Sequence, residues 1–273
     1  MSAMIDLRRP DQRDTVLQNP FWMTSSLIEF SAGNVLTPGY SPSVKTPVAI
    51  KGAGAITAAT LAAVDANPDT ITDSGNGLVA AGFLANDVVY ISGFSGAGAA
   101  ANLEFATIDA GGVAVGALTM VVGDTLIADA AGEAVTVQTM KPVLLFSFPV
   151  AGKRVIIHEV AVQVVTAFTA TTEFILGDGT IATDAVTTGG VLTTVARNSY
   201  VLNGATLATP AYYGPGTTSA WYTAAGLNGF TSPRTLLGAA TTVPCIMGFF
   251  GNAAVIAAGA LRVHLLVSYI PGF

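Results

Sequence analysis

Asp87–Phe105 reads DVVYISGFSGAGAAANLEF, and the class of fold depends on how this stretch is interpreted. A β-branched, apolar run comes first and predicts a strand. The segment Gly96–Ala101, GAGAAA, loosely has the glycine spacing of a dinucleotide-binding turn, but such a turn must open a helix that holds the pyrophosphate. A second short β-like run, LEFATIDAGG, follows instead. The stretch therefore predicts an antiparallel hairpin and argues against nucleotide binding.

The surrounding residues 52–140 repeat this pattern. Turn compositions such as DSGNG and DAGG separate the apolar runs TLAAVDA, TITD, DVVYISGF, LEFATIDA, ALTMVVG and AVTVQTM. Spacings of about a dozen residues predict a small antiparallel sandwich or barrel over 51–140. This unit carries nine acidic residues and no Lys or Arg. Its alanine-rich stretch at 56–64 is predicted to form one or two helical turns at most.

Residues 141–273 predict a larger all-β unit. The strand candidates are VLLFSFPV, RVIIHEVAVQVVTAF, TEFILGDG, RNSYVL, SAWYTA, CIMGFFGN and LRVHLLVSYI. Strands this apolar on both faces are expected to be covered on both sides, by a second sheet and by a neighbouring subunit. The expected fold is thus all-β: an antiparallel, jelly-roll-like sandwich over 141–273 with a second small β-module.

Residues 1–50 predict an extended N-terminal arm. Five of the thirteen prolines lie here, and proline at this density blocks long helices. The apolar segment FWMTSSLIEF favours an arm that docks on a partner, and the alternative is a disordered tail. The candidate partner-contact residues of the arm are Arg8, Arg9, Arg13, Phe21, Trp22 and Phe30.

Composition indicates a protein that works in an assembly. Charged residues make up 10% of the chain, hydrophobic residues 51%, and the mean hydropathy is +0.60. The longest apolar run, Ile246–Leu261, is interrupted by three glycines and Asn252, and is too short to span a membrane. So few charges leave an apolar surface that is usually buried against partners.

The net charge is −6 with eleven Lys and Arg, so no basic stripe is present to neutralise a nucleic acid. The charged start, MSAMIDLRRPDQRD, has no apolar stretch behind it and does not resemble a secretory signal. The single cysteine, Cys245, fits synthesis in a reducing cytoplasm.

No motif predicts an enzyme, and no cofactor is expected. Gly93–Ala97 nearly matches the hydrolase elbow Gly-x-Ser-x-Gly, but its last residue is alanine and no strand-turn-helix context surrounds it. Strand alternation places His158 with Ile156 and Val160 on an apolar face, which favours a packed histidine over a catalytic one. His264 alternates with Arg262 and Leu266.

A metal site is not predicted, because two histidines and one cysteine have no zinc-ligand spacing. The loop at 65–77, DANPDTITDSGNG, does not fit an EF-hand, since Thr70 and Asn76 stand where glycine and glutamate are needed. An irregular calcium site at Asp65, Asp69 and Asp73 stays open as an alternative to a plain turn.

Two passages resemble virion proteins of tailed bacteriophages. One is TITDSGNGLVAAGFLANDVVYISGFSG continuing to LIADAAGEAVTV; the other is FPVAGKRVIIHEVAVQVVTAFTATTEFILGDG with LRVHLLVSYI near the end. They are similar to β-rich head and tail proteins, including head-decoration (cement) proteins. The resemblance covers a little over half of the chain and consists of turn and strand patterns.

This resemblance implies a non-enzymatic, multi-copy protein of the virion surface, made in the host bacterial cytoplasm. The expected partners are the major capsid protein and further copies of the chain, with a trimer favoured; nucleic acid and membrane are not expected. The alternative is a tail or fibre component that binds a host receptor or glycan through aromatics such as Tyr212, Tyr213, Trp221 and Tyr222.

Overall fold

The structure is a computed structural model, and every secondary-structure element in the part of the chain that it describes is a β-strand. That part comprises residues 20–25, 27–31, 35–37, 48–49, 51–96, 102–124, 126–148, 154–168, 173–182, 192–201, 210–213, 234–237, 242–251, 256 and 258–270. The strands form three sheets, and neighbouring strands run antiparallel. The all-β class predicted from the sequence is confirmed.

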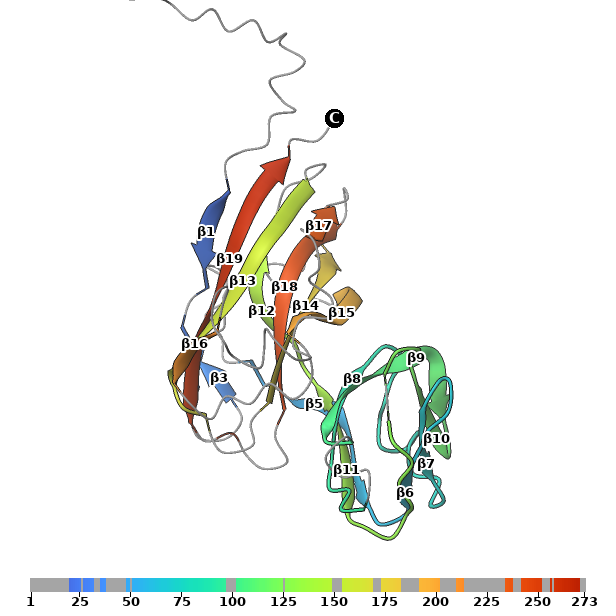
Figure 1. The fold of residues 1–273 in the computed structure, drawn as a ribbon. Helices are drawn as coiled ribbons and strands as arrows, with labels where there is room; N and C mark the ends of the chain where they lie inside the picture. The colour runs from blue at the N-terminus through green and yellow to red at the C-terminus, as the bar shows by residue number, and fades with distance from the viewer. Residues whose placement is uncertain are drawn as a thin grey trace, which may run out of the picture.

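The largest sheet has eight strands in the order β16-β13-β19-β2-β3-β4, with β1 also beside β19 and β17 beside β13. Its strands are β1 (Phe21–Thr24), β2 (Ile28–Ser31), β3 (Val35–Thr37), β4 (Val48–Ala49), β13 (Arg154–Thr166), β16 (Ala211–Tyr213), β17 (Arg234–Leu237) and β19 (Gly259–Ile270). The long pair β13 and β19 forms its centre, as Figure 1 shows.

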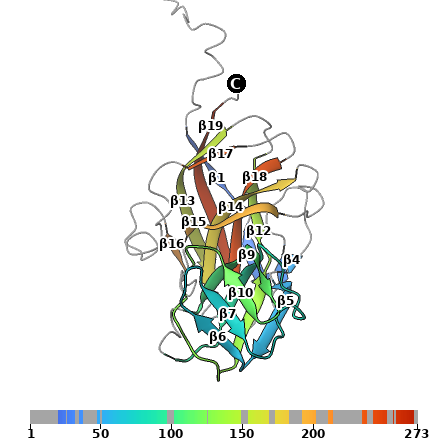
Figure 2. The ribbon, with the colours of Figure 1, turned by 90° about the vertical axis from the view of Figure 1, so that its right-hand side faces the viewer.

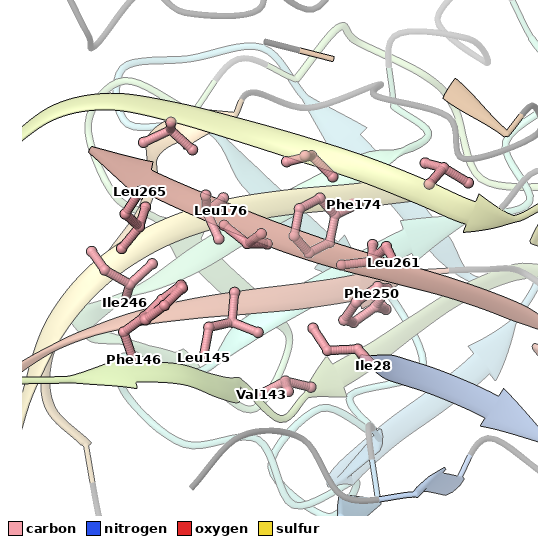
Figure 3. Packing of buried hydrophobic residues seen from close by; sticks show 14 of the residues in the cluster. Ile28, Val143, Leu145, Phe146, Phe174, Leu176, Ile246, Phe250, Leu261 and Leu265 are labelled. Carbon is pink, nitrogen blue, oxygen red and sulfur yellow. The ribbon is translucent and has the colours of Figure 1, made fainter. Parts of the chain in front are cut away.

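A four-stranded sheet lies against it, in the order β12 (Val143–Ser147), β18 (Thr242–Gly251), β14 (Glu173–Ala182) and β15 (Leu192–Val201). The two sheets enclose one apolar core in a two-layer, sandwich-like arrangement: Leu265 of β19 and Leu145 of β12 belong to the same buried cluster (Figure 3). The ring of Phe250 lies 4.7 Å from Phe30 and 4.8 Å from Phe174 between centroids. Each buried side chain of this size contributes about 1.5–3 kcal/mol to folding.

The third sheet has seven strands, all drawn from residues 51–140. Its order is β5 (Lys51–Ala58), β11 (Val135–Met140), β8 (Val88–Ser92), β9 (Glu104–Ala114), β10 (Ala117–Met120), β7 (Thr70–Asp73) and β6 (Leu61–Val64). Leu61 of β6, at one end of this order, and Val137 of β11, one strand from the other end, share one buried cluster. The sheet therefore curls around its own core (Figure 2).

The hairpin predicted for Asp87–Phe105 is confirmed. β8 pairs antiparallel with β9, with Val88 opposite Thr107 and Ile91 opposite Glu104. A dinucleotide turn would need parallel strands and a crossover, so this pairing rules it out.

The alanine-rich stretch at 56–64 forms no helical turn in the structure. It comprises the end of β5 and all of β6, because Leu61 and Ala63 alternate into the core of the seven-stranded sheet. Burial of every second side chain stabilises a strand and overrides the helix preference of alanine.

The predicted face of His158 is wrong. A β-bulge between Ile157 and Glu159 shifts the register of β13 against β19 and reverses the alternation. Ile157 and Val160 both point into the core, while the His158 ring faces outward and its Nε2 lies 2.8 Å from the Ser268 hydroxyl.

No helix long and apolar enough to cross a membrane occurs among the described residues.

Candidate partner-contact surface

Two of the predicted contact residues lie on β1 and are exposed. Phe21 and Trp22 expose 40% and 49% of their surface, although aromatic side chains of this size are usually covered. Phe21 stacks on Tyr269, with ring centroids 5.8 Å apart. Arg8, Arg9 and Arg13, predicted as contacts too, lie outside the described residues.

Phe30, also predicted as a contact, lies in the core of its own chain. It is 3% exposed and packs edge-on against Phe168 and Phe250. β2 buries Ile28 and Phe30 because alternate residues of a strand face the same side. We therefore omit Phe30 from the contact surface.

β1 is an edge strand. Its four residues pair with β19, with Trp22 opposite Leu266 and Thr24 opposite His264, and no strand in the described part of the chain lies on its other side. The Thr24 hydroxyl lies 2.9 Å from His264 Nδ1, which ties the end of β1 to β19. An exposed edge that carries aromatic side chains is suited to pair with or dock on another chain.

Both histidines of the chain lie on the outer face of the eight-stranded sheet. His158 contacts Ser268, and His264 lies near Arg262. Burial, and then the charge of Arg262, lower the pKa of His264 below its ordinary value. The lowered pKa favours the neutral form of this imidazole.

Two acidic residues of the loop considered as a calcium site accept hydrogen bonds from groups of the same chain. Asp73 Oδ1 accepts hydrogen bonds from the Thr60 hydroxyl (2.6 Å) and Gly75 N–H (2.8 Å), and Oδ2 accepts one from Gly77 N–H (2.6 Å). Asp69 is bonded in the same way by the N–H groups of Ala66 and Leu126. The described residues contain no group of three or more His, Cys, Asp or Glu that could hold a metal ion.

Ser95, the serine of the near-elbow motif, also has a local role. Its N–H and its hydroxyl both donate to the Glu133 carboxylate on the segment before β11. These hydrogen bonds lower the pKa of Glu133. The pair closes the loop that follows β8.

A second feature is the joint between the seven-stranded and four-stranded sheets. Outward-facing side chains of the former, Tyr90 and Phe105, join a buried cluster with Ile175 and Phe249 from the outer face of the latter. Gly251 is part of the joint: a β-carbon placed there would lie 2.4 Å from the Tyr90 ring and 2.7 Å from the Phe105 ring. The joint therefore requires a residue without a side chain at the end of β18.

The joint also contains a buried carboxyl group. Glu173, at the start of β14 and opposite Gly251, is 5% exposed, and its carboxylate lies beside the hydroxyl of Tyr90, which is 2% exposed. Their geometry falls short of a regular hydrogen bond, and neither Tyr90 Oη nor Glu173 Oε2 has another partner in the described part. Burial raises the pKa of Glu173 to about 7 although Tyr90 opposes the shift; burial and the neighbouring carboxylate raise the pKa of Tyr90 above its usual range.

The sequence offers no local signal for this pair. Glu173 stands in TEFILGDG, where strand alternation places it beside Ile175 on one face but does not show which residues cover that face. It is buried because β8 and β9, from a different sheet, cover that face.

Comparison with protein families, with curated proteins and with solved structures finds no match to this chain.

Proposed function

We propose that this chain is a structural protein of a tailed-phage virion that decorates the outside of the head and bridges capsomer junctions. The observation that carries the proposal is β1, an edge strand open on one side that exposes Phe21 and Trp22. Its partners would be the major capsid protein and other copies of the chain, with a trimer favoured. The resemblance of the sequence to head-decoration proteins supports the same role.

The proposal divides the chain into three working parts. Residues 1–50 contribute β1–β4 to the eight-stranded sheet, and within them β1 would contact the shell or a neighbour. Residues 51–140 form an outward-facing acidic module, and residues 141–273 form a jelly-roll-like sandwich that makes subunit and capsid contacts.

The exposed apolar surface fits an assembled state. Among the described residues, six of the nine exposed large hydrophobic side chains lie between residues 52 and 140, a range without Lys or Arg: Val64, Val79, Leu84, Val115, Val122 and Ile127. Apolar side chains on a surface without basic residues favour contacts with a partner that is apolar or basic.

Decoration would act through buried interface area. A specific protein–protein contact of ordinary size buries about 1,200–2,000 Å². Repeated at every capsomer junction, such contacts would resist the outward pressure of packaged genome without any chemical step.

Quantitative mass spectrometry of purified virions tests the proposal. We expect hundreds of copies of the chain per particle, in a fixed ratio to the major capsid protein. A few copies per particle would contradict decoration, and binding of the isolated chain to a glycan array would then favour the receptor-binding alternative.

A binding assay tests the contribution of β1. Heads prepared without the chain should bind purified wild-type chain, and Trp22→Ser should weaken this binding by about tenfold or more, as expected for an aromatic anchor. Val165→Ser is the matched control, because Val165 is 40% exposed in the same sheet but lies on β13, across β19 from β1. Equal binding by Trp22→Ser and wild type would exclude β1 as the contact.

A further inference from the structure

The seven-stranded sheet is attached to the rest of the chain by a narrow connection. Residue 50 alone separates β4 from β5, and Lys141 and Pro142 separate β11 from β12. The two connecting segments lie side by side, because Met140 pairs with Lys51. A single two-stranded ribbon therefore links the bodies, which Figure 1 shows at the labels β5 and β11.

Among the described residues, the apolar joint provides the contact between the two bodies apart from this ribbon. Its apolar members from the seven-stranded sheet are Val88, Tyr90, Phe105 and Met140, and those from the four-stranded sheet include Ile175, Met247 and Phe249. Glu173 is the acidic group that faces Tyr90 within this contact. A charged carboxylate enclosed there loses its hydration, and none of the described side chains of this cluster is a cation that could compensate for this loss.

Glu173 has one titratable neighbour across the joint, Tyr90 on β8. The other titratable groups on the elements that meet here are Glu104 and the exposed Asp109 on β9, Asp178 on β14, Cys245 on β18 and the exposed Lys141 after β11. Glu104 is opposite Ile91 and Asp178 is opposite Ile246, so each faces the core of its own sheet system. Cys245 shares the outer face with Glu173 but lies six residues before Gly251 along β18.

We propose that this joint is a proton-dependent latch: protonated Glu173 holds the seven-stranded sheet against the outer face of the four-stranded sheet, and loss of the proton releases it. The sheets themselves stay folded, and the paired ribbon at Lys51 and Met140 serves as the hinge. In an assembled protein, this latch would let pH set how the acidic module is held relative to the sandwich.

Closing of the joint depends on pH because it is linked to proton binding by Glu173. The pKa of Glu173 is raised from 4.5 to about 7 in the closed joint, so closing takes up a proton between these values. The closed state is therefore most favoured below about pH 4.5, weakens as the pH rises towards 7, and is least favoured above 7.

Hydrogen–deuterium exchange of the full chain at about pH 5.5 and about pH 8.5, corrected for the intrinsic pH dependence of exchange, tests the latch. In wild type, we expect peptides covering β8 and the end of β18 to lose up to ~30-fold protection at the higher pH, if release restores the ordinary pKa of Glu173. β7, which lies away from the joint in the strand order, serves as the internal reference and should change less than about twofold. Glu173→Gln should keep the joint protected at both pH values, because the amide carries no charge.

A second variant covers the case in which Glu173→Gln does not fold. Tyr90→Phe removes the hydroxyl that lowers the pKa of Glu173, so the loss of protection should move to higher pH. The latch is overturned if wild-type protection at the joint is the same at both pH values. It is also overturned if Glu173→Gln retains the full pH dependence, or if Tyr90→Phe leaves the midpoint unchanged.

Discussion

Asp73 shows how a single residue can fix the local path of the chain. Its carboxylate is 3% exposed and accepts three hydrogen bonds, from Thr60, Gly75 and Gly77. Burial opposes the charge of Asp73, but these hydrogen bonds together outweigh it and lower its pKa. The acidic side chain is thus part of the turn and is not available as a cation ligand.

Asp73→Ala should lower the free energy of unfolding by about 2–3 kcal/mol, because it leaves three donors without their charged acceptor. The stabilisation exists above the ordinary pKa of 3.8 and is lost as the pH falls through the lowered value. Urea unfolding at neutral and acidic pH should therefore show a gap between wild type and variant that closes in acid. The control is Asp109→Ala at an exposed residue with one backbone contact, where a loss of 2 kcal/mol would contradict this account.

Single residues also show which positions the sequence can predict and which it cannot. The DSGNG composition predicted the turn at Asp73, because Asp, Asn and Gly have local turn preferences. The outward position of His158 depends on a bulge set by pairing with β19, about a hundred residues away, and no local pattern encodes it. The apolar segment around Phe30 predicts a contact, but pairing of β2 with the distant strand β19 fixes the place of Phe30 and so its burial.

At the scale of elements, the β8–β9 hairpin was predictable because both runs are rich in β-branched and aromatic residues. β5 was missed: KGAGAITA is mostly glycine and alanine, and has little intrinsic strand preference. Its pairing with β11 explains its conformation, since a β-carbon at Gly54 would lie 2.9 Å from both Phe83 and Thr139. Close packing against neighbouring strands selected small residues there.

The glycine after β8 allows the packing of β8 against the start of β11 to be tested. Gly93 and Gly123 both have positive φ, 102° and 107°, but only Gly93 is crowded: its β-carbon would lie 2.4 Å from the Ala134 carbonyl oxygen. Gly123→Ala should cost about 1–2 kcal/mol from backbone strain alone. Gly93→Ala should cost about 1–3 kcal/mol more, because β8 would be pushed away from the start of β11. Equal losses in chemical denaturation would contradict the packing described here.

For the whole molecule, we expect the joint to make the two bodies unfold as one cooperative unit. The seven-stranded sheet has its own core, but Tyr90 and Phe105 pack on Gly251 of the sandwich-like body. We expect a single unfolding transition by calorimetry at about pH 5.5, where the joint is closed.

Gly251→Ala should separate this transition into two, since the added methyl group cannot fit against the two rings. Gly111→Ala is the matched control, because nothing lies within 4 Å of its β-carbon position, and it should keep the single transition. Two transitions in wild type at this pH, or one in Gly251→Ala, would show that the joint does not couple the bodies.

Sequence composition predicts an assembled protein and gives no sign of the internal joint. The acidic, lysine-free character of 52–140 is readable from the sequence because it is a property of composition. The surface on which that region packs involves β8, β9, β14 and β18, which are brought together by the tertiary fold. Such a contact becomes visible only in three dimensions.

A cryo-electron microscopy reconstruction of intact heads tests the proposed function most directly. The proposal predicts density on the outer surface at capsomer junctions, present at every equivalent site, into which the three sheets fit with β1 against a neighbouring chain. Heads that lack such density, or density for this chain confined to the tail, would contradict it.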